Sequence, residues 1–208
     1  MAKQLKRAFF ARDTHIVAKE LLGKLLVRRW RGNFLAGRVN EVESYVGEND
    51  LACHAAKGRT KRTEVMFGEA GHAYVYLVYG MYCCLNVVTQ EPGFPAAVLV
   101  RGLMSWNVLP AIANESGDNS ISFSAFTQKM GEANVGQTAL NGPGKLCRAM
   151  HISKAQNGED LTISNKLWLI DGGYGVGRDR ILATPRIGVE YAGKDALLPW
   201  RYLLPPRS

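Results

Sequence analysis

The segment from Ala73 to Thr89 restricts the possible folds of this chain more than any other part of the sequence. It reads A-Y-V-Y-L-V-Y-G-M-Y-C-C-L-N-V-V-T, in which β-branched and aromatic residues dominate and Gly80 is the only turn former. Such composition favours strands, and one turn former between two apolar runs is typical of a hairpin. We therefore predict two antiparallel strands joined at Tyr79-Gly80-Met81.

The other segments predict further strands and short helices. Asp13 or Thr14 is suited to cap a helix that ends before Gly23. Strands are predicted over 24–30, 34–43, 96–100 and 166–171, a helix after Gly142-Pro143-Gly144, and loop with strand over T-P-R-I-G-V-E-Y-A-G. The stretch from Asn107 to Leu140 is rich in Ser, Asn, Gly and Gln, and we expect a loop with a little helix. Without repeats or a low-complexity linker, we predict one domain over residues 1–208.

The chain is basic and has enough apolar residues for a core. It has 26 Lys and Arg against 18 Asp and Glu, a formal net charge of +8, and 47% hydrophobic residues. This apolar fraction argues against wholesale disorder. The positive charge favours a polyanionic partner or an anionic membrane surface, although many basic proteins bind neither.

The cysteines and the chain start indicate an intracellular protein. Cys53, Cys83, Cys84 and Cys147 include no C-x-x-C pair, and a disulfide framework is not expected in a chain of this size with so few cysteines. We interpret them as buried thiols. The basic start lacks a following apolar run, and no stretch is long enough for a transmembrane helix. We expect a cytoplasmic or nucleoid location if the chain is bacterial, and no membrane partner.

Glu43 is the first candidate for chemistry. It ends a predicted strand, and alternation places Glu41, Glu43 and Tyr45 on one side if the strand continues that far. A carboxylate beside an aromatic surface suits a general base, because partial desolvation raises its pKa toward neutrality. A solvated acid at a strand end explains the same residues.

The tyrosines of the predicted hairpin have two possible roles. Tyr74 and Tyr76 share a face of the first strand, and Tyr82 begins the second. Core packing explains Tyr74 and Tyr82 well. It explains Tyr79 less well, because an aromatic at a hairpin tip has little core to enter. An exposed apolar wedge there could separate stacked bases.

Basic residues and histidines complete the candidate set. Arg59, Lys61 and Arg62 form a basic cluster with Lys57, and Arg101 and Lys145 could help them to hold phosphates, although a solvated loop is an equal explanation. His54 adjoins Cys53, but no second ligand pair has suitable spacing, so we predict no metal site. Hydrogen bonding near a substrate, or packing, suits His54 better.

Four segments together resemble the alkyladenine, or 3-methyladenine, DNA glycosylases of the single-domain mixed type. They are E-V-E-S-Y-V-G from Glu41, C-H-A-A-K-G-R-T-K-R-T from Cys53, Y-V-Y-L-V-Y-G-M-Y-C-C-L-N-V from Tyr74 and N-G-P-G-K-L-C from Asn141. The third is the most specific. The resemblance extends from Phe9 to Leu204, nearly the whole chain.

The resemblance implies catalytic and DNA-inserting residues. Glu43 matches the general base that activates the attacking water, and Arg101 matches an arginine near the sugar and this water. Tyr79 matches the residue that fills the gap left by a flipped nucleotide, with Met81 beside it at the hairpin tip.

The resemblance also implies a base-binding pocket. Tyr45 and Tyr76 match the aromatics that sandwich the extruded base, and His54 matches a residue that hydrogen-bonds the base edge. Asn86 matches a residue that discriminates against the exocyclic amine of normal guanine.

As a whole, the resemblance implies an α+β fold with a curved antiparallel sheet, surrounding helices and a protruding hairpin that inserts into DNA. The implied activity is monofunctional excision of 3-alkyladenine, 7-alkylguanine and hypoxanthine, with ethenoadenine as a further candidate, by a monomer that acts on damaged duplex DNA without a cofactor. Val42 and Ser44 occupy positions that vary in the family, and 107–140 matches nothing in it, which leaves the lesion range open. A lesion-binding protein that does not cut, and an RNA-binding domain, are the alternatives.

Overall fold

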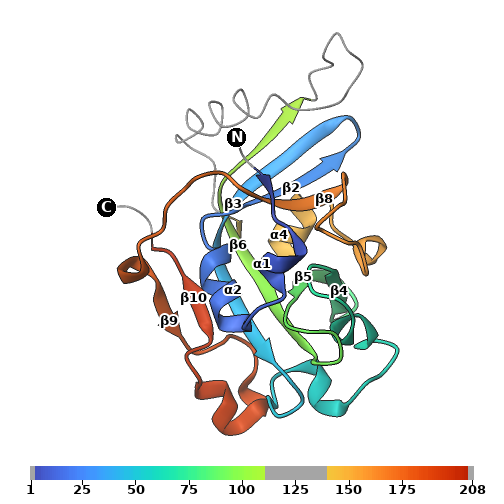
Figure 1. Ribbon diagram of the computed structural model, residues 1–208, viewed down its shortest axis with the longest axis vertical. Coiled ribbons are helices and arrows are strands. Elements are labelled where there is room, and N and C mark those ends of the chain that lie inside the picture. The colour runs from blue at the N-terminus through green and yellow to red at the C-terminus, as the bar shows by residue number, and fades with distance from the viewer. Residues whose placement is uncertain (1–2, 111–139, 206–208) are drawn as a thin grey trace.

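An antiparallel sheet with strong curvature organises the molecule (Figure 1). The computed structural model describes residues 3–110 and 140–205. In these ranges the chain forms ten strands, which are β1 (Lys3–Gln4), β2 (Leu25–Trp30), β3 (Asn33–Val46), β4 (Ala73–Val78), β5 (Tyr82–Val88), β6 (Ala96–Pro110), β7 (Leu140–Asn141), β8 (Leu167–Asp171), β9 (Leu182–Thr184) and β10 (Arg201–Leu203). The main path through the sheet runs β1-β8-β2-β3-β6-β5-β4.

Strands β3 and β6 form the long spine of this sheet. They pair from Asn33 with Pro110 to Val46 with Ala96, and three register irregularities fall between Ala36 and Val42. Bulges of this kind bend a strand and increase its twist. The first half of β3 pairs with β2, whereas its second half pairs with β10, which in turn pairs with β9. The bent spine therefore brings the last strands of the chain beside Glu43.

The helices are short and flank the sheet. They are α1 (Arg7–Phe10), α2 (Thr14–Leu21) and α4 (Pro143–Ala149), with 3₁₀ helices η1 (His54–Lys57), η2 (Glu64–Phe67), η3 (Lys154–Gln156), η4 (Arg178–Arg180) and η5 (Glu190–Leu197). Asp13 caps α2 as predicted, because its side chain accepts the backbone N–H groups of His15 and Ile16 at 2.9 and 3.0 Å. None of the helices within the described ranges is long and apolar enough to span a bilayer.

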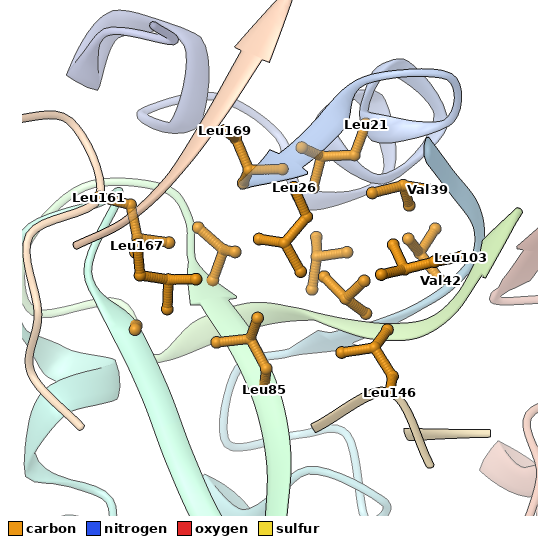
Figure 2. Packing of buried hydrophobic residues seen from close by; sticks show 14 of the residues in the cluster. Leu21, Leu26, Val39, Val42, Leu85, Leu103, Leu146, Leu161, Leu167 and Leu169 are labelled. Carbon is orange, nitrogen blue, oxygen red and sulfur yellow. The ribbon is translucent and has the colours of Figure 1, made fainter. Parts of the chain in front are cut away.

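The main hydrophobic core lies between the sheet and these helices. Figure 2 shows its leucines and valines converging from the helices and from strands far apart in sequence. Leu21 of α2, Leu26 of β2, Leu85 of β5, Leu103 of β6 and Leu146 of α4 are each completely buried. This apolar centre fixes the positions of β3, β5, β6 and α4, which also carry the candidate site residues.

The predicted hairpin is confirmed as β4 and β5. The strands pair from Ala73 with Val87 to Val78 with Tyr82. The amide of Met81 donates to the carbonyl of Val78 at 3.1 Å, and Tyr79 and Gly80 both adopt positive φ, +51° and +69°. Positive φ at both central residues matches the right-handed twist of the flanking strands.

Two parts of the sequence-based assignment need correction. The strand predicted over 96–100 continues to Pro110, so Asn107 begins no loop but pairs with Ala36. Residues 190–197, partly expected as strand, form the 3₁₀ helix η5. The rest of the loop predicted between Asn107 and Leu140, residues 111–139, lies outside the described residues.

The central core should tolerate truncation poorly. Leu85→Ala removes a fully buried side chain and should lower the free energy of unfolding by about 2–5 kcal/mol, because lost burial and a residual cavity add. Chemical denaturation measures this change. Ile163→Ala is the control, since 77% of that side chain's surface is exposed, and its effect should stay within about 0.5 kcal/mol. Equal losses for both variants would contradict this account of the core.

Candidate active site

A pocket of about 760 Å³ opens where the end of β3, the hairpin, β6, the start of α4 and the segment 187–191 meet. Its wall is rich in aromatic side chains, namely Tyr45, Tyr74, Tyr76, Tyr79, Tyr82 and Tyr191. It also carries the cations Arg62, Arg101, Lys145 and Arg148, and no carboxylate of the described residues lines it. The pocket therefore offers flat apolar surfaces inside a positively charged rim.

Backbone register aligns several of the predicted residues. Glu43 of β3 lies opposite Leu99 of β6, Leu99 opposite Asn86 of β5, and Asn86 opposite Tyr74 of β4. Glu41 pairs with Gly102 and Val42 with Val100, so Arg101 is left without a partner residue in a bulge. The bulge directs the Arg101 side chain to Glu41 and Glu43, on the same side of the sheet.

Glu43 is completely buried and accepts three hydrogen bonds. Its Oε1 accepts the backbone N–H of Ile187 at 2.8 Å. Its Oε2 accepts the hydroxyl of Tyr45 at 2.8 Å and Nη1 of Arg101 at 3.3 Å. Glu43 does not line the pocket, but Tyr45, Arg101 and Ile187 do. The carboxylate thus lies one layer behind the pocket wall.

The surroundings of Glu43 act on its pKa in opposite directions. Desolvation is the largest influence and raises the pKa, whereas Arg101, the Ile187 amide and the Tyr45 hydroxyl lower it, and the net change is upward. Burial and the neighbouring carboxylate raise the pKa of Tyr45, so its hydroxyl keeps its proton and remains a donor. A desolvated glutamate with an elevated pKa is a better proton acceptor near neutral pH than an exposed one.

Arg101 also belongs to a wider ionic network. Its Nε lies 2.9 Å from Oε1 of Glu41, and Nε of Arg201 lies 2.7 Å from the same oxygen. Glu41 therefore fixes the Arg101 guanidinium next to Glu43. The predicted alignment of Glu41, Glu43 and Tyr45 on one side is confirmed, because all three join this network.

His54 lies in an aromatic cluster on the other wall. Its Nδ1 is 2.9 Å from the Tyr74 hydroxyl, and its ring meets the Tyr76 ring edge-on at 4.5 Å. Burial, followed by Arg62 and Lys57, lowers the pKa of His54 to about 4. His54 is therefore neutral at physiological pH, with one nitrogen able to donate and the other to accept. Asn86 is buried beneath this cluster, and its amide donates to the Tyr74 carbonyl at 3.0 Å.

The hairpin tip presents its aromatic and apolar side chains to solvent. Tyr79 is 87% exposed and Met81 is 70% exposed. Tyr74 packs in the interior as predicted, but the same expectation for Tyr82 is wrong, since Tyr82 is 41% exposed and lines the pocket. As the first residue of β5, Tyr82 lies next to the tip and outside the core.

The predicted phosphate-binding residues take different positions. Lys145 is exposed and lines the pocket at the start of α4. Arg62 also lines it, with its guanidinium 5.0 Å from the centre of the Tyr76 ring. Arg59 is ion-paired with Glu64 at 2.5 Å outside the pocket, and Lys61 is exposed on the same loop. Of the residues predicted to hold phosphates, the structure thus brings Arg62, Arg101 and Lys145 into the pocket wall, and Arg101 is already paired with Glu41 and Glu43.

Sequence reasoning missed the segment around Arg186. Arg186 is buried and forms two hydrogen bonds with Asp50, and it lies between the rings of Tyr45 and Trp200. It precedes Ile187, whose amide reaches Glu43. The only local signal was an arginine between Pro185 and Gly188 in a segment without periodicity.

The cysteines of the described chain are reduced, and one of them, Cys84, lines the pocket. Cys53, Cys84 and Cys147 are buried, Cys83 is half-buried, and all four are free thiols. Among residues 3–110 and 140–205, no group of three or more His, Cys, Asp or Glu side chains is arranged to hold a metal ion. Fold and site together define a protein with an aromatic, cation-rimmed pocket in front of a buried carboxylate.

Comparison with known proteins identifies the family. A family model described as methylpurine-DNA glycosylase (MPG) matches residues 8–207. A protein of Methanocella arvoryzae named "Putative 3-methyladenine DNA glycosylase" is 48% identical over 95% of this chain and 90% of its own length. Proteins with the same name from Sodalis glossinidius and Alkaliphilus oremlandii are 43% and 41% identical, over 95% and 97% of this chain and 95% of each relative. The chain therefore belongs to the methylpurine-DNA glycosylase family.

Acid should destabilise the folded protein partly through His54. The unfolded chain binds a proton at His54 near its ordinary pKa of 6.5, but the folded protein does so only near 4. The free energy of unfolding should therefore decrease as the pH falls from about 6.5 to 4, and His54→Gln should make this decrease shallower. Denaturation at a series of pH values measures the slope. Part of it should remain, because burial also lowers the pKa of His15. Equal slopes for wild type and variant would contradict the assignment.

Proposed function

We propose that this protein is a monofunctional DNA glycosylase of base-excision repair. It flips a damaged purine out of duplex DNA and hydrolyses the bond between base and sugar, leaving an abasic site. The observation that carries the proposal is the buried Glu43 carboxylate behind an aromatic, cation-rimmed pocket, in a chain of this family. The proposed substrates are 3-alkyladenine, 7-alkylguanine and hypoxanthine, with ethenoadenine as a further candidate.

The charge and the hairpin suit a DNA duplex. Lys145, Arg62 and Arg148 around the pocket would neutralise phosphates, and Lys61 extends this positive surface along the loop. Arg59 would join them only after leaving Glu64. Such contacts give salt-dependent affinity that does not depend on sequence. The protein is proposed to act on the duplex as a monomer.

Tyr79 is proposed to occupy the gap left by the flipped nucleotide, with Met81 beside it. Its side chain is 87% exposed, and its backbone has φ of +51°. A non-glycine residue in this conformation costs about 1–2 kcal/mol, so an exposed tyrosine there contributes little to folding. Local strain of this kind is often found at functional sites.

The pocket behind the hairpin would hold the extruded base. Tyr45 and Tyr76 offer aromatic faces, and cation–π attraction of about 0.5–2 kcal/mol would favour a positively charged alkylpurine. Nε2 of neutral His54, which lies 3.3 Å from Nη2 of Arg62, can accept a hydrogen bond from the edge of the base. Asn86 beneath the pocket would disfavour the exocyclic amine of normal guanine.

Glu43 is proposed to act as the general base. It removes a proton from a water molecule whose oxygen attacks the anomeric carbon of the sugar. The bond between carbon and purine nitrogen breaks, and its electron pair leaves with the base. An alkylated base leaves as a neutral molecule, whereas neutral hypoxanthine needs a proton or strong hydrogen bonds. Arg101 lies beside Oε2 and would orient the water.

Glu43 is enclosed in the free protein, so the water needs a route to it. Tyr45 and Arg101 both contact Oε2 and both line the pocket. When the base stacks on Tyr45, a small shift of Nη1 of Arg101, whose contact with Oε2 is the longer one at 3.3 Å, would let a water reach Oε2 at about 2.6–3.2 Å. Hydrogen bonds at active sites commonly rearrange in this way when the substrate binds.

A lesion-binding protein that does not cut DNA is the alternative function. The same pocket and hairpin would serve it, but a pure binder needs no buried carboxylate beside the base. Glu43 therefore favours the enzyme.

Glu43→Gln should abolish excision and preserve binding. The amide keeps the shape of the side chain and the oxygen that accepts the Ile187 N–H, but it cannot take a proton from water. Single-turnover assays on duplexes with one hypoxanthine or one alkylated purine, developed with hot alkali, measure the abasic product. Glu64→Gln is the matched control, since Glu64 is exposed and outside the pocket, and it should keep full activity.

Tight lesion binding by wild type without any product would favour the lesion-binding alternative. A covalent adduct trapped by borohydride would refute simple hydrolysis.

The rate of excision should fall in acid with the protonation of Glu43. Burial raises the pKa of Glu43 above the ordinary value for glutamate, so the acidic limb of the pH–rate profile should lie above about pH 4.3. His54, with a pKa of about 4, should contribute nothing to a limb above pH 5. Single-turnover rates between pH 4.5 and 8 test this, with His54→Gln as control. If replacing His54 shifts the acidic limb, the protonation that slows excision belongs to His54 and not to Glu43.

Tyr79→Ala should leave the protein as stable as wild type but weaken its action on duplex DNA. The side chain is almost fully exposed, so its removal costs little packing. Excision from duplex should fall at least tenfold, because nothing then blocks return of the nucleotide to the stack. Tyr79→Phe is the control and should retain most of the activity. Wild-type excision by Tyr79→Ala would exclude this role.

A further inference from the structure

Two of the three groups that donate to Glu43 are held in place by one buried arginine. The Arg186 guanidinium lies 4.9 Å from the centre of the Tyr45 ring, and the Tyr45 hydroxyl donates to Oε2 of Glu43. The next residue after Arg186 is Ile187, whose backbone N–H donates to Oε1. The third donor, Arg101, is instead fixed by Glu41.

Arg186 is itself anchored on several sides. Its Nη1 and Nη2 donate to the two carboxylate oxygens of Asp50 at 2.6 and 2.8 Å, and both side chains are essentially inaccessible to solvent. Nη1 also donates to the carbonyl of Ser44, between Glu43 and Tyr45, at 2.9 Å. Nη2 donates to the carbonyl of Asp195 at 3.1 Å. The guanidinium thus ties together β3, the turn at Asp50, the segment before Ile187 and η5.

Asp50 completes the arrangement from the opposite side. Its carboxylate also accepts the backbone N–H groups of Val46 and Ala52, each at 3.1 Å. The turn after Tyr45 is therefore held by the carboxylate that holds Arg186. A bidentate pair of this kind fixes both position and orientation.

We infer that Arg186, anchored by Asp50, is a positioning residue for excision: it holds the Tyr45 hydroxyl and the Ile187 amide on Glu43 and so sets the geometry in which Glu43 accepts a proton. Arg186 touches neither base nor sugar in this role. The inference deepens the proposed function and rests on it, since Glu43 must be the general base for its geometry to affect excision.

The consequence for Glu43 has a defined sign. The Ile187 and Tyr45 hydrogen bonds both lower the pKa of Glu43 against the effect of burial, so loosening them raises it. The acidic limb of the excision profile then moves to higher pH. The titratable and charged groups around Glu43 are Glu41, Tyr45, Asp50, Cys84, Arg101, Arg186 and Arg201, and the variants below change only Arg186 and Asp50 among them.

The test uses two variants of the full-length protein. Arg186→Lys keeps a cation near Asp50 but cannot form the same set of hydrogen bonds. The double variant Arg186→Gln/Asp50→Asn removes both charges, so no buried charge is left unpaired if the single change impairs folding. Arg7→Gln is the matched control, because Arg7 also ties loops together, through Asp160 and the Ala70 carbonyl, at a place that does not line the pocket.

Three measurements are made on each variant. Single-turnover excision between pH 4.5 and 8 gives the maximal rate and the acidic limb. Titration against an uncleavable lesion duplex with a 2′-fluoro sugar gives the affinity. Carbon-13 NMR of carboxyl-labelled glutamate, assigned with Glu43→Gln, gives the titration midpoint of Glu43 whether or not the protein excises any base.

The expected result is a maximal rate at neutral pH at least tenfold lower in both Arg186 variants, with lesion affinity within threefold of wild type. The acidic limb and the Glu43 midpoint should both move to higher pH, and neither should move in Arg7→Gln. A lower rate with an unmoved limb and midpoint would overturn the inference and leave Arg186 a merely structural residue. If wild type excises nothing while the midpoint still moves, the proposed function fails but the positioning of Glu43 by Arg186 stands.

Discussion

The burial of one carboxylate determines how the rest of this structure is arranged. Glu43 has no exposed surface, and an unpaired charge there would be strongly destabilising. Three donors meet it, and they come from positions 45, 101 and 187. A charge enclosed in this way requires β3, β6 and the segment before η5 to converge, so the fold of the C-terminal third is coupled to a single side chain near the end of β3.

The bulges of the β3–β6 spine make this convergence possible. In a regular pairing, Arg101 would lie opposite a residue of β3. Because Glu41 pairs with Gly102 and Val42 pairs with Val100, Arg101 has no partner residue in β3. The same bend lets β10 pair with β3 at Glu41–Glu43, where β2 no longer does. Arg201 of β10 then shares Glu41 with Arg101. The local distortion therefore assembles the ionic network around Glu41 and Glu43.

The sequence predicted the parts of the site that depend on local rules. Strand alternation placed Glu41, Glu43 and Tyr45 together, and one glycine among aromatic residues located the hairpin and its exposed tip. It did not predict the bulge at Arg101 or the continuation of β6 to Pro110, because neither follows from period-two alternation. The Arg186–Asp50 pair joins residues 136 positions apart, which no local pattern can reveal. Composition also could not predict which arginine of the basic cluster reaches the pocket. Arg62 lies over the Tyr76 ring, whereas Arg59 is paired with Glu64.

The features that favour function are unfavourable for stability, and they lie away from the main core. Tyr79 adopts positive φ at an exposed tip, and His54 and Glu43 both have pKa values displaced by burial against their charged forms. The packed leucines of α2, β2, β5 and α4 (Figure 2) form one cluster. Tyr74, Cys53 and Met66 belong to a separate cluster at the pocket. Because stability is the balance of such terms over the whole molecule, apolar burial in the first cluster offsets the cost of strain and desolvation at the pocket. The buried carboxylate with its raised pKa is thus part of a stability–function balance in which the central core carries the favourable side.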